Sequence, residues 1–68
     1  MEKTIVTLET TRTHHSAQAA AKNTMTVGEL ISYLEQYDGD TPVVFSNDEG
    51  YTYGCIEHYC IGEATMED

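Results

Sequence analysis

Apolar residues between positions 25 and 42 recur with the period of an amphipathic α-helix. They stand at spacing i, i+3, i+4 and i+7, which forms one apolar stripe: Val27, Leu30, Ile31 and Leu34. Gly39 and Pro42 come next, and both residue types commonly stand just beyond the end of a helix. The pattern therefore predicts a helix over residues 27–37.

The start of this predicted helix carries two local signals. Thr26 and Glu29 have the spacing of a capping box, in which the hydroxyl of Thr26 accepts from the amide of Glu29. The carboxylate of Glu29 accepts from the amide of Thr26 in return. Met25 and Leu30 have the spacing of a hydrophobic staple, so we expect the helix to begin directly after Thr26.

Three other segments have the composition of β-strands. Residues 3–12 are rich in Thr, Val and Ile, with Val6 and Leu8 pointing inward. A second strand is expected over residues 43–46 and a third from Tyr51 to about position 61, with a bulge near Gly54. Residues 47–50 between them predict a type I hairpin turn closed by a left-handed glycine.

The element order β-α-β-β indicates an α+β fold in which one helix packs on a three-stranded mixed sheet. The favoured strand order is 1-3-2, and the alternative places the first strand beside the second. We expect residues 1–68 to form a single small domain. Residues 13–24 connect the first strand to the helix, either flexibly or with a short extra helix near 16–22. Residues 62–68 are expected to form a frayed acidic tail.

Charge is distributed unevenly along this chain of net charge −9. Lys3, Arg12 and Lys22 are its only bases, whereas ten acids and no Lys or Arg follow Asn23. Such a surface argues against direct binding to nucleic acid or to an anionic membrane. It leaves two interpretations open, a surface that keeps the protein soluble and a surface that binds a basic partner. The lack of a signal-peptide pattern leads us to expect a cytoplasmic protein.

Candidate catalytic and metal-binding patterns are weak. Cys55, His58 and Cys60 suggest zinc, but C-x2-H-x-C is not a standard zinc spacing. On a regular strand the two cysteines would point to opposite faces, so we expect no metal and a fold that forms without one. No phosphate-binding glycine loop is present in the sequence, and we expect neither a cofactor nor enzymatic activity.

The predicted helix and hairpin share a recognisable combination of capping and turn residues. They read TVGELI at residues 26–31, Leu at 34, YDGDTPVV at residues 37–44 and DEGYTYG at residues 48–54. This combination resembles small, mostly uncharacterised proteins of phages, prophages and other mobile elements. The resemblance implies a mobile-element origin, and small acidic proteins from that setting are similar to anti-CRISPR or anti-restriction inhibitors that imitate nucleic acid charge. It supplies no functional residues.

Two kinds of residue are candidates for partner contact: acids in the turns at the two ends of the second strand, and tyrosines on the third. They are Asp38, Asp40, Asp48, Glu49, Tyr51 and Tyr53. Tyrosine is enriched at interfaces. The leading hypothesis is a non-enzymatic binding protein that occupies a basic surface of a host protein or nucleoprotein complex. The alternatives are a self-associating accessory protein, as a homodimer, and a small-ligand or metal-binding domain.

Overall fold

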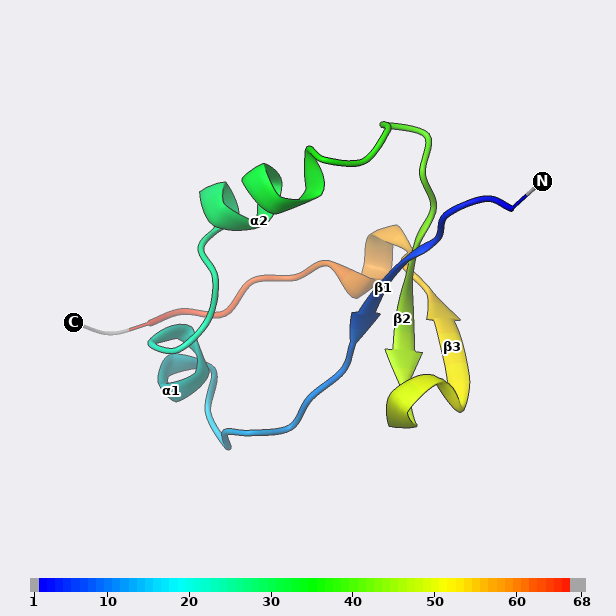
Figure 1. Ribbon diagram of the computed structural model, residues 1–68. Helices are drawn as coiled ribbons and strands as arrows, with labels where there is room; N and C mark the ends of the chain where they lie inside the picture. The colour runs from blue at the N-terminus through cyan, green and yellow to red at the C-terminus, as the bar shows by residue number, and fades with distance from the viewer. Residues whose placement is uncertain (1, 67–68) are drawn as a thin grey trace. The chain divides into compact units, whose positions relative to one another are not determined.

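The computed structural model describes residues 2–66, which form a three-stranded sheet, two α-helices and two 3-10 helices (Figure 1). In chain order these are β1 (Val6–Glu9), α1 (Ala17–Ala21), α2 (Val27–Leu34), β2 (Val43–Asn47), η1 (Asp48–Gly50), β3 (Thr52–Cys55) and η2 (His58–Cys60). The predicted α+β class and mixed sheet are confirmed.

The chain divides into two compact units. The first contains the chain up to Thr11 together with Asp40–Gly62, and it holds the whole sheet. The second contains Arg12–Gly39 and the chain from Glu63 onward, and it holds both α-helices. The packing of the helix on the sheet and the single domain stay predictions, and each unit is described by itself.

β2 is the central strand of the sheet, in the order β1-β2-β3 (Figure 1). β1 runs parallel to β2 with Val6 opposite Val43, and β3 runs antiparallel to β2 with Gly54 opposite Phe45. The favoured order 1-3-2 is therefore wrong. The alternative, in which the first strand lies beside the second, is the arrangement observed.

The composition of the strands explains why β2 is central. β2 offers apolar side chains on both of its faces, at Val44 on one and at Val43 and Phe45 on the other, and all three are half-buried. Central strands are buried from both sides and need such residues. β3 has the sequence TYGC with three of its four residues exposed, which suits an edge.

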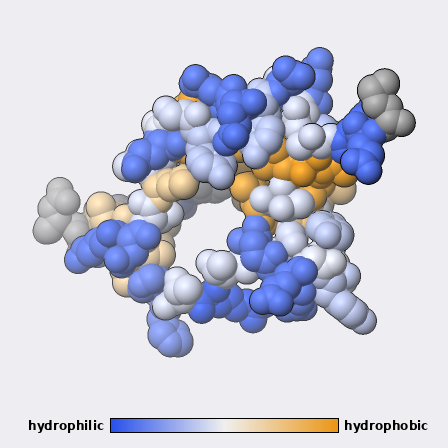
Figure 2. Space-filling view, in the orientation of Figure 1, coloured by the Kyte–Doolittle hydropathy of each residue, from blue (hydrophilic) through white to orange (hydrophobic). Residues whose placement is uncertain are grey.

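One face of the sheet carries its small apolar core. Val6 is buried and Leu8 is half-buried, whereas the other two residues of β1 are exposed, as the predicted alternation requires. The register places this pair beside Val43 and Phe45. Val6 and Ser46 are the only buried residues in the part of the chain that the structure describes. Hydrophobic residues gather over the sheet, and hydrophilic colours cover most of the remaining face in view (Figure 2).

β3 ends much earlier than the sequence pattern suggests. The strand stops at Cys55, and the chain turns into η2 at His58 instead of continuing to position 61. The register pairs Val44 with Cys55, which would bring Pro42 opposite residue 57. The carbonyl of Pro42 accepts the N–H of Val6 at 2.9 Å, so the backbone of Pro42 is directed toward β1 and not toward β3. The pairing of β2 with β3 ends at Val44 and Cys55. The register is continuous through Gly54, so the bulge predicted near Gly54 is wrong.

α2 begins as its capping signal predicts and ends three residues earlier than expected, at Leu34. Thr26 accepts the N–H of Glu29 at 3.2 Å, and Glu29 accepts the N–H and the O–H of Thr26 at 3.0 and 3.1 Å. These bonds stabilise the carboxylate and lower the pKa of Glu29 from its ordinary value, the backbone bond contributing most. Val27 and Ile31 on the apolar stripe are 78% and 53% exposed.

The predicted short helix in the connecting segment is present as α1. Ser16 caps it by accepting the N–H of Ala19 at 3.1 Å. In the predicted tail, residues 62–66 have no regular secondary structure and are exposed, and Glu67 and Asp68 lie outside the described residues. Between residues 2 and 66 no helix is both long and apolar enough to span a membrane.

Substitution of the N-cap residue tests the helix start. Thr26→Ala should cost about 1 kcal/mol of helix stability, because the amide of Glu29 loses its acceptor. Circular dichroism during urea denaturation measures the change. Thr24→Ala is the matched control, since Thr24 is exposed and precedes the cap. An equal effect of the two substitutions would contradict the assigned cap.

The lowered pKa of Glu29 predicts a loss of helix stability in acid. A carboxyl whose pKa is lower in the folded state contributes stability above its unfolded pKa, and loses it as pH falls through the folded value. Helicity followed from pH 7 into acid should show this loss, and Glu29→Gln should remove that part of the pH dependence. Glu63→Gln, an exposed acid outside the cap, should not. Identical acid profiles for all three proteins would contradict the prediction.

Candidate protein-binding surface on the hairpin

The six residues predicted to contact a partner fall into two groups that flank β2 in the sequence. Asp38 and Asp40 precede the strand, and the other four follow it: Asp48, Glu49, Tyr51 and Tyr53. All six are exposed. The five residues of β2 span about 17 Å, which exceeds the screening length of about 8 Å at physiological ionic strength. Asp40 and the loop acids therefore act as separate charges. We call the second group the hairpin surface.

A row of three paired residues, one on each strand, contacts the loop of the hairpin surface at both of its ends. Glu9, Ser46 and Tyr53 are paired in register across β1, β2 and β3, on the face opposite Val6. The carboxylate of Glu9 accepts the N–H of Glu49 at 3.1 Å. Ser46, in the middle of the row, is only 5% exposed. The loop is thus held to β1 as well as to the hairpin that contains it.

The other end of this row contacts the loop through Tyr53. A Cβ atom placed on Gly50 would lie 3.1 Å from the hydroxyl oxygen of Tyr53, so the phenol lies close against the glycine backbone. Tyr53 is nevertheless 60% exposed, and Tyr51 is 83% exposed. Both rings are accessible beside the two loop carboxylates.

The backbone of the loop has an uncommon conformation. Asp48, Glu49 and Gly50 have φ values of 51°, 56° and 95°, so two consecutive non-glycine residues occupy the left-handed region. The type I turn predicted for residues 47–50 is therefore wrong, although the left-handed Gly50 is confirmed. The amide of Tyr51 closes the loop by donating to the carbonyls of Asn47 and Asp48 at 3.0 and 3.2 Å.

Tertiary hydrogen bonds compensate for this backbone strain. Each non-glycine residue in the left-handed region costs on the order of 1–2 kcal/mol. Glu9 holds the amide of Glu49, and the hydroxyl of Thr10 donates to the side-chain carbonyl oxygen of Asn47 at 2.8 Å. Both bonds join the end of β1 to the loop. Sequence reasoning missed Glu9, Thr10 and Asn47, because nothing local links residues 37 to 40 positions apart.

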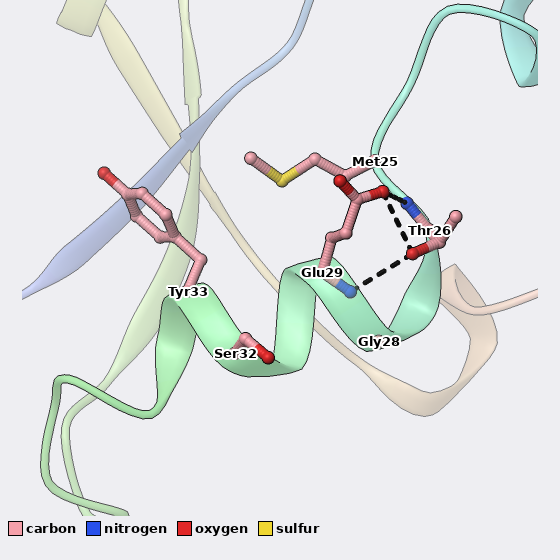
Figure 3. A pocket seen from close by; sticks show the side chains of 6 residues that line it. All are labelled: Met25, Thr26, Gly28, Glu29, Ser32 and Tyr33. Carbon is pink, nitrogen blue, oxygen red and sulfur yellow. Dashed lines mark hydrogen bonds between the residues drawn. The ribbon is translucent and has the colours of Figure 1, made fainter.

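A shallow surface depression lies along α2 in the second unit, and Figure 3 shows the residues that line it: Met25, Thr26, Gly28, Glu29, Ser32 and Tyr33. Its carboxylate belongs to Glu29, which already accepts both donors of Thr26 (Figure 3). Its charged group is thus committed to the helix cap, so the depression does not form a candidate catalytic site.

The two cysteines do not diverge as expected. β3 ends at Cys55, and the thiol of Cys60 approaches the carbonyl oxygen of Cys55 at 4.0 Å. The expectation of opposite strand faces is wrong because Cys60 belongs to η2 and not to a strand. Both cysteines are exposed and free. Over residues 2–66, no group of three or more His, Cys, Asp or Glu side chains is arranged to hold a metal ion.

Comparison with known proteins adds no relative: no protein-family model matches the chain, and no match is found among curated proteins or solved structures. The chemistry of the hairpin surface must be inferred from its own groups. Two carboxylates there can accept hydrogen bonds from Lys or Arg, and two phenol rings can stack on a guanidinium group.

The strained loop backbone predicts that glycine is preferred at position 49. Glu49→Gly should stabilise the hairpin by about 1 kcal/mol, because glycine adopts φ near +56° without a Cβ clash and keeps the N–H that Glu9 accepts. Thermal denaturation measures the change. Glu57→Gly is the matched control, since Glu57 has φ −113° and gains no relief. Equal destabilisation by the two substitutions would contradict the left-handed assignment.

Proposed function

We propose that this chain is a non-enzymatic acidic binding protein whose hairpin surface docks on a basic surface of a larger partner. The observation that carries the proposal is the position of Asp48 and Glu49, exposed on a loop that Glu9 and Thr10 tie to the sheet. A restrained loop loses little conformational entropy on binding. Binding of a partner to the two loop carboxylates therefore costs little conformational entropy.

The charge of the chain supports a basic partner. Ten acids and no Lys or Arg follow Asn23, and the eight of these acids that lie within residues 2–66 are all exposed. Such a surface attracts Lys- and Arg-rich sites from a distance and accelerates association. Tyr51 and Tyr53 add contact area with a polar tip beside the loop carboxylates.

The class of partner is proposed from the resemblance of the helix and hairpin residues to small phage and prophage proteins. Inhibitors of host defence from that setting act on nucleic-acid-binding complexes, which carry basic channels. We therefore propose that the partner is a host defence complex of the kind that anti-CRISPR or anti-restriction proteins inhibit. The chain would occupy the basic site in place of nucleic acid.

Charge reversal on the loop tests this proposal. The tagged protein and its Asp48→Lys/Glu49→Lys variant are used to capture partners from nuclease-treated bacterial lysate. The variant should lose the captured partner, with affinity reduced by about tenfold or more and mainly through a slower association rate. Binding of the parent should fall steeply between about 50 mM and about 500 mM salt. A DNA oligonucleotide should displace the parent from its partner, as expected of a competitor for the same basic site.

A matched variant separates the hairpin surface from net charge. Glu35→Lys/Glu63→Lys changes the charge of the chain by the same amount at exposed positions outside the hairpin. It should retain most of the affinity. If both double variants bind equally well, or if salt has no effect on the parent, the acids serve solubility and the proposal fails.

A further inference from the structure

The outer edge of β3 is an open strand edge whose unpaired groups can be identified from the hydrogen bonds of the sheet. The N–H groups of Val6 and Thr10 donate to the carbonyls of Pro42 and Ser46, both at 2.9 Å. The N–H and C=O of one residue in a strand point the same way, and successive residues alternate. The backbone N–H and C=O groups of the even-numbered residues of β2 therefore point to β1, and those of Phe45 point to β3.

The same alternation determines which backbone N–H and C=O groups of β3 point away from β2. Phe45 is opposite Gly54 and Asn47 is opposite Thr52, so these pairs exchange the hydrogen bonds of the β2–β3 ladder. Tyr53 and Cys55 lie between them, and their backbone N–H and C=O groups point away from β2. Both residues are exposed, and β3 is the last strand of the sheet. Such an edge can pair with an added strand.

We propose that an extended segment of the partner, with Lys or Arg at alternate positions, adds to the sheet along β3. This inference rests on the proposed function and specifies how the hairpin surface is used. Carboxylates stand at both ends of the strand, Asp48 and Glu49 before it and Glu57 after it. A basic side chain opposite Tyr53 would lie within reach of the phenol ring and of the loop acids.

Charge decides between this occupant and a second copy of the chain. Pairing two β3 strands would bring two chains of net charge −9 together, with Asp48, Glu49 and Glu57 of each copy near the new interface. Like charges near one another oppose association. A basic strand gains attraction at the same positions, so the charges favour it over self-pairing.

The experiment uses the full chain and a synthetic peptide in which arginine and valine alternate. On binding, the amides of Tyr53 and Cys55 should become protected from hydrogen exchange by about tenfold or more, because they gain acceptors. A peptide of the same sequence in which every backbone amide is N-methylated should bind more weakly, since it has no N–H to donate to a ladder. Equal affinity for both peptides without amide protection, or no binding of either peptide, would overturn strand addition.

A pair of variants at position 53 isolates the backbone contribution. Tyr53→Pro removes an outward N–H and keeps the bonds to β2, whereas Tyr53→Ala removes the same side chain and keeps the N–H. Tyr53→Pro should bind the arginine–valine peptide about tenfold more weakly than Tyr53→Ala. Equal binding by the two variants would overturn the proposal. The exchange measurement on the parent decides the question if Tyr53→Pro does not fold.

Two outcomes separate this inference from the proposed function. Loss of the lysate partner by the loop charge variant, with no protection of the β3 amides by peptide, would overturn strand addition and leave the proposed function standing. Sedimentation should find a monomer at low and high protein concentration. A dimer that Tyr53→Pro dissociates and Tyr53→Ala retains would show that a second copy is the occupant, and would overturn the basic segment.

Discussion

The parallel pairing of β1 with β2 is the constraint on which the first unit depends. It directs the backbone groups of the even-numbered residues of β2 toward β1, so those of the odd-numbered residues pair with β3. This pairing determines which amides of β3 point to the open edge. It also brings Glu9 and Thr10 to the loop, where they hold Glu49 and Asn47. A local hairpin of two strands is marginal by itself. β1, which comes from the beginning of the chain, adds a third strand to this hairpin. It therefore stabilises both the β2–β3 ladder and the loop.

The parts of the fold that could be predicted from sequence are those with a local cause. The capping box at Thr26 and Glu29, the short helix near Ala17–Ala21, the alternation at Val6 and Leu8, and the left-handed Gly50 each depend on a few neighbouring residues. Strand order depends instead on comparing whole strands. The apolar residues on both faces of β2 favour a central position for this strand, whereas the predicted order 1-3-2 placed the third strand there.

The features that escaped prediction depend mainly on residues that are distant in the sequence. The hydrogen bond between Glu9 and Glu49 spans 40 positions, so no local sequence pattern predicts it. The left-handed backbone at Asp48 and Glu49 is restrained by such tertiary bonds as well as by the local bonds of the Tyr51 amide. The end of β3 at Cys55 was also missed, because the expected alternation of residues continues to about position 61. The exposure of the six candidate residues and their position at the two ends of β2 followed from their polar, turn-rich context, but the hydrogen bond from the loop to Glu9 required the sheet.

The shortness of β3 has a consequence for the behaviour of this protein at high concentration. Because β3 ends at Cys55, its open edge offers the outward backbone groups of two residues, Tyr53 and Cys55. Long, flat and unpaired edges recruit further strands of the same protein and lead to aggregation and amyloid, which natural sheets avoid with short, charged edges. The early end of β3 thus keeps the edge long enough for a brief backbone contact and too short to template a growing fibre.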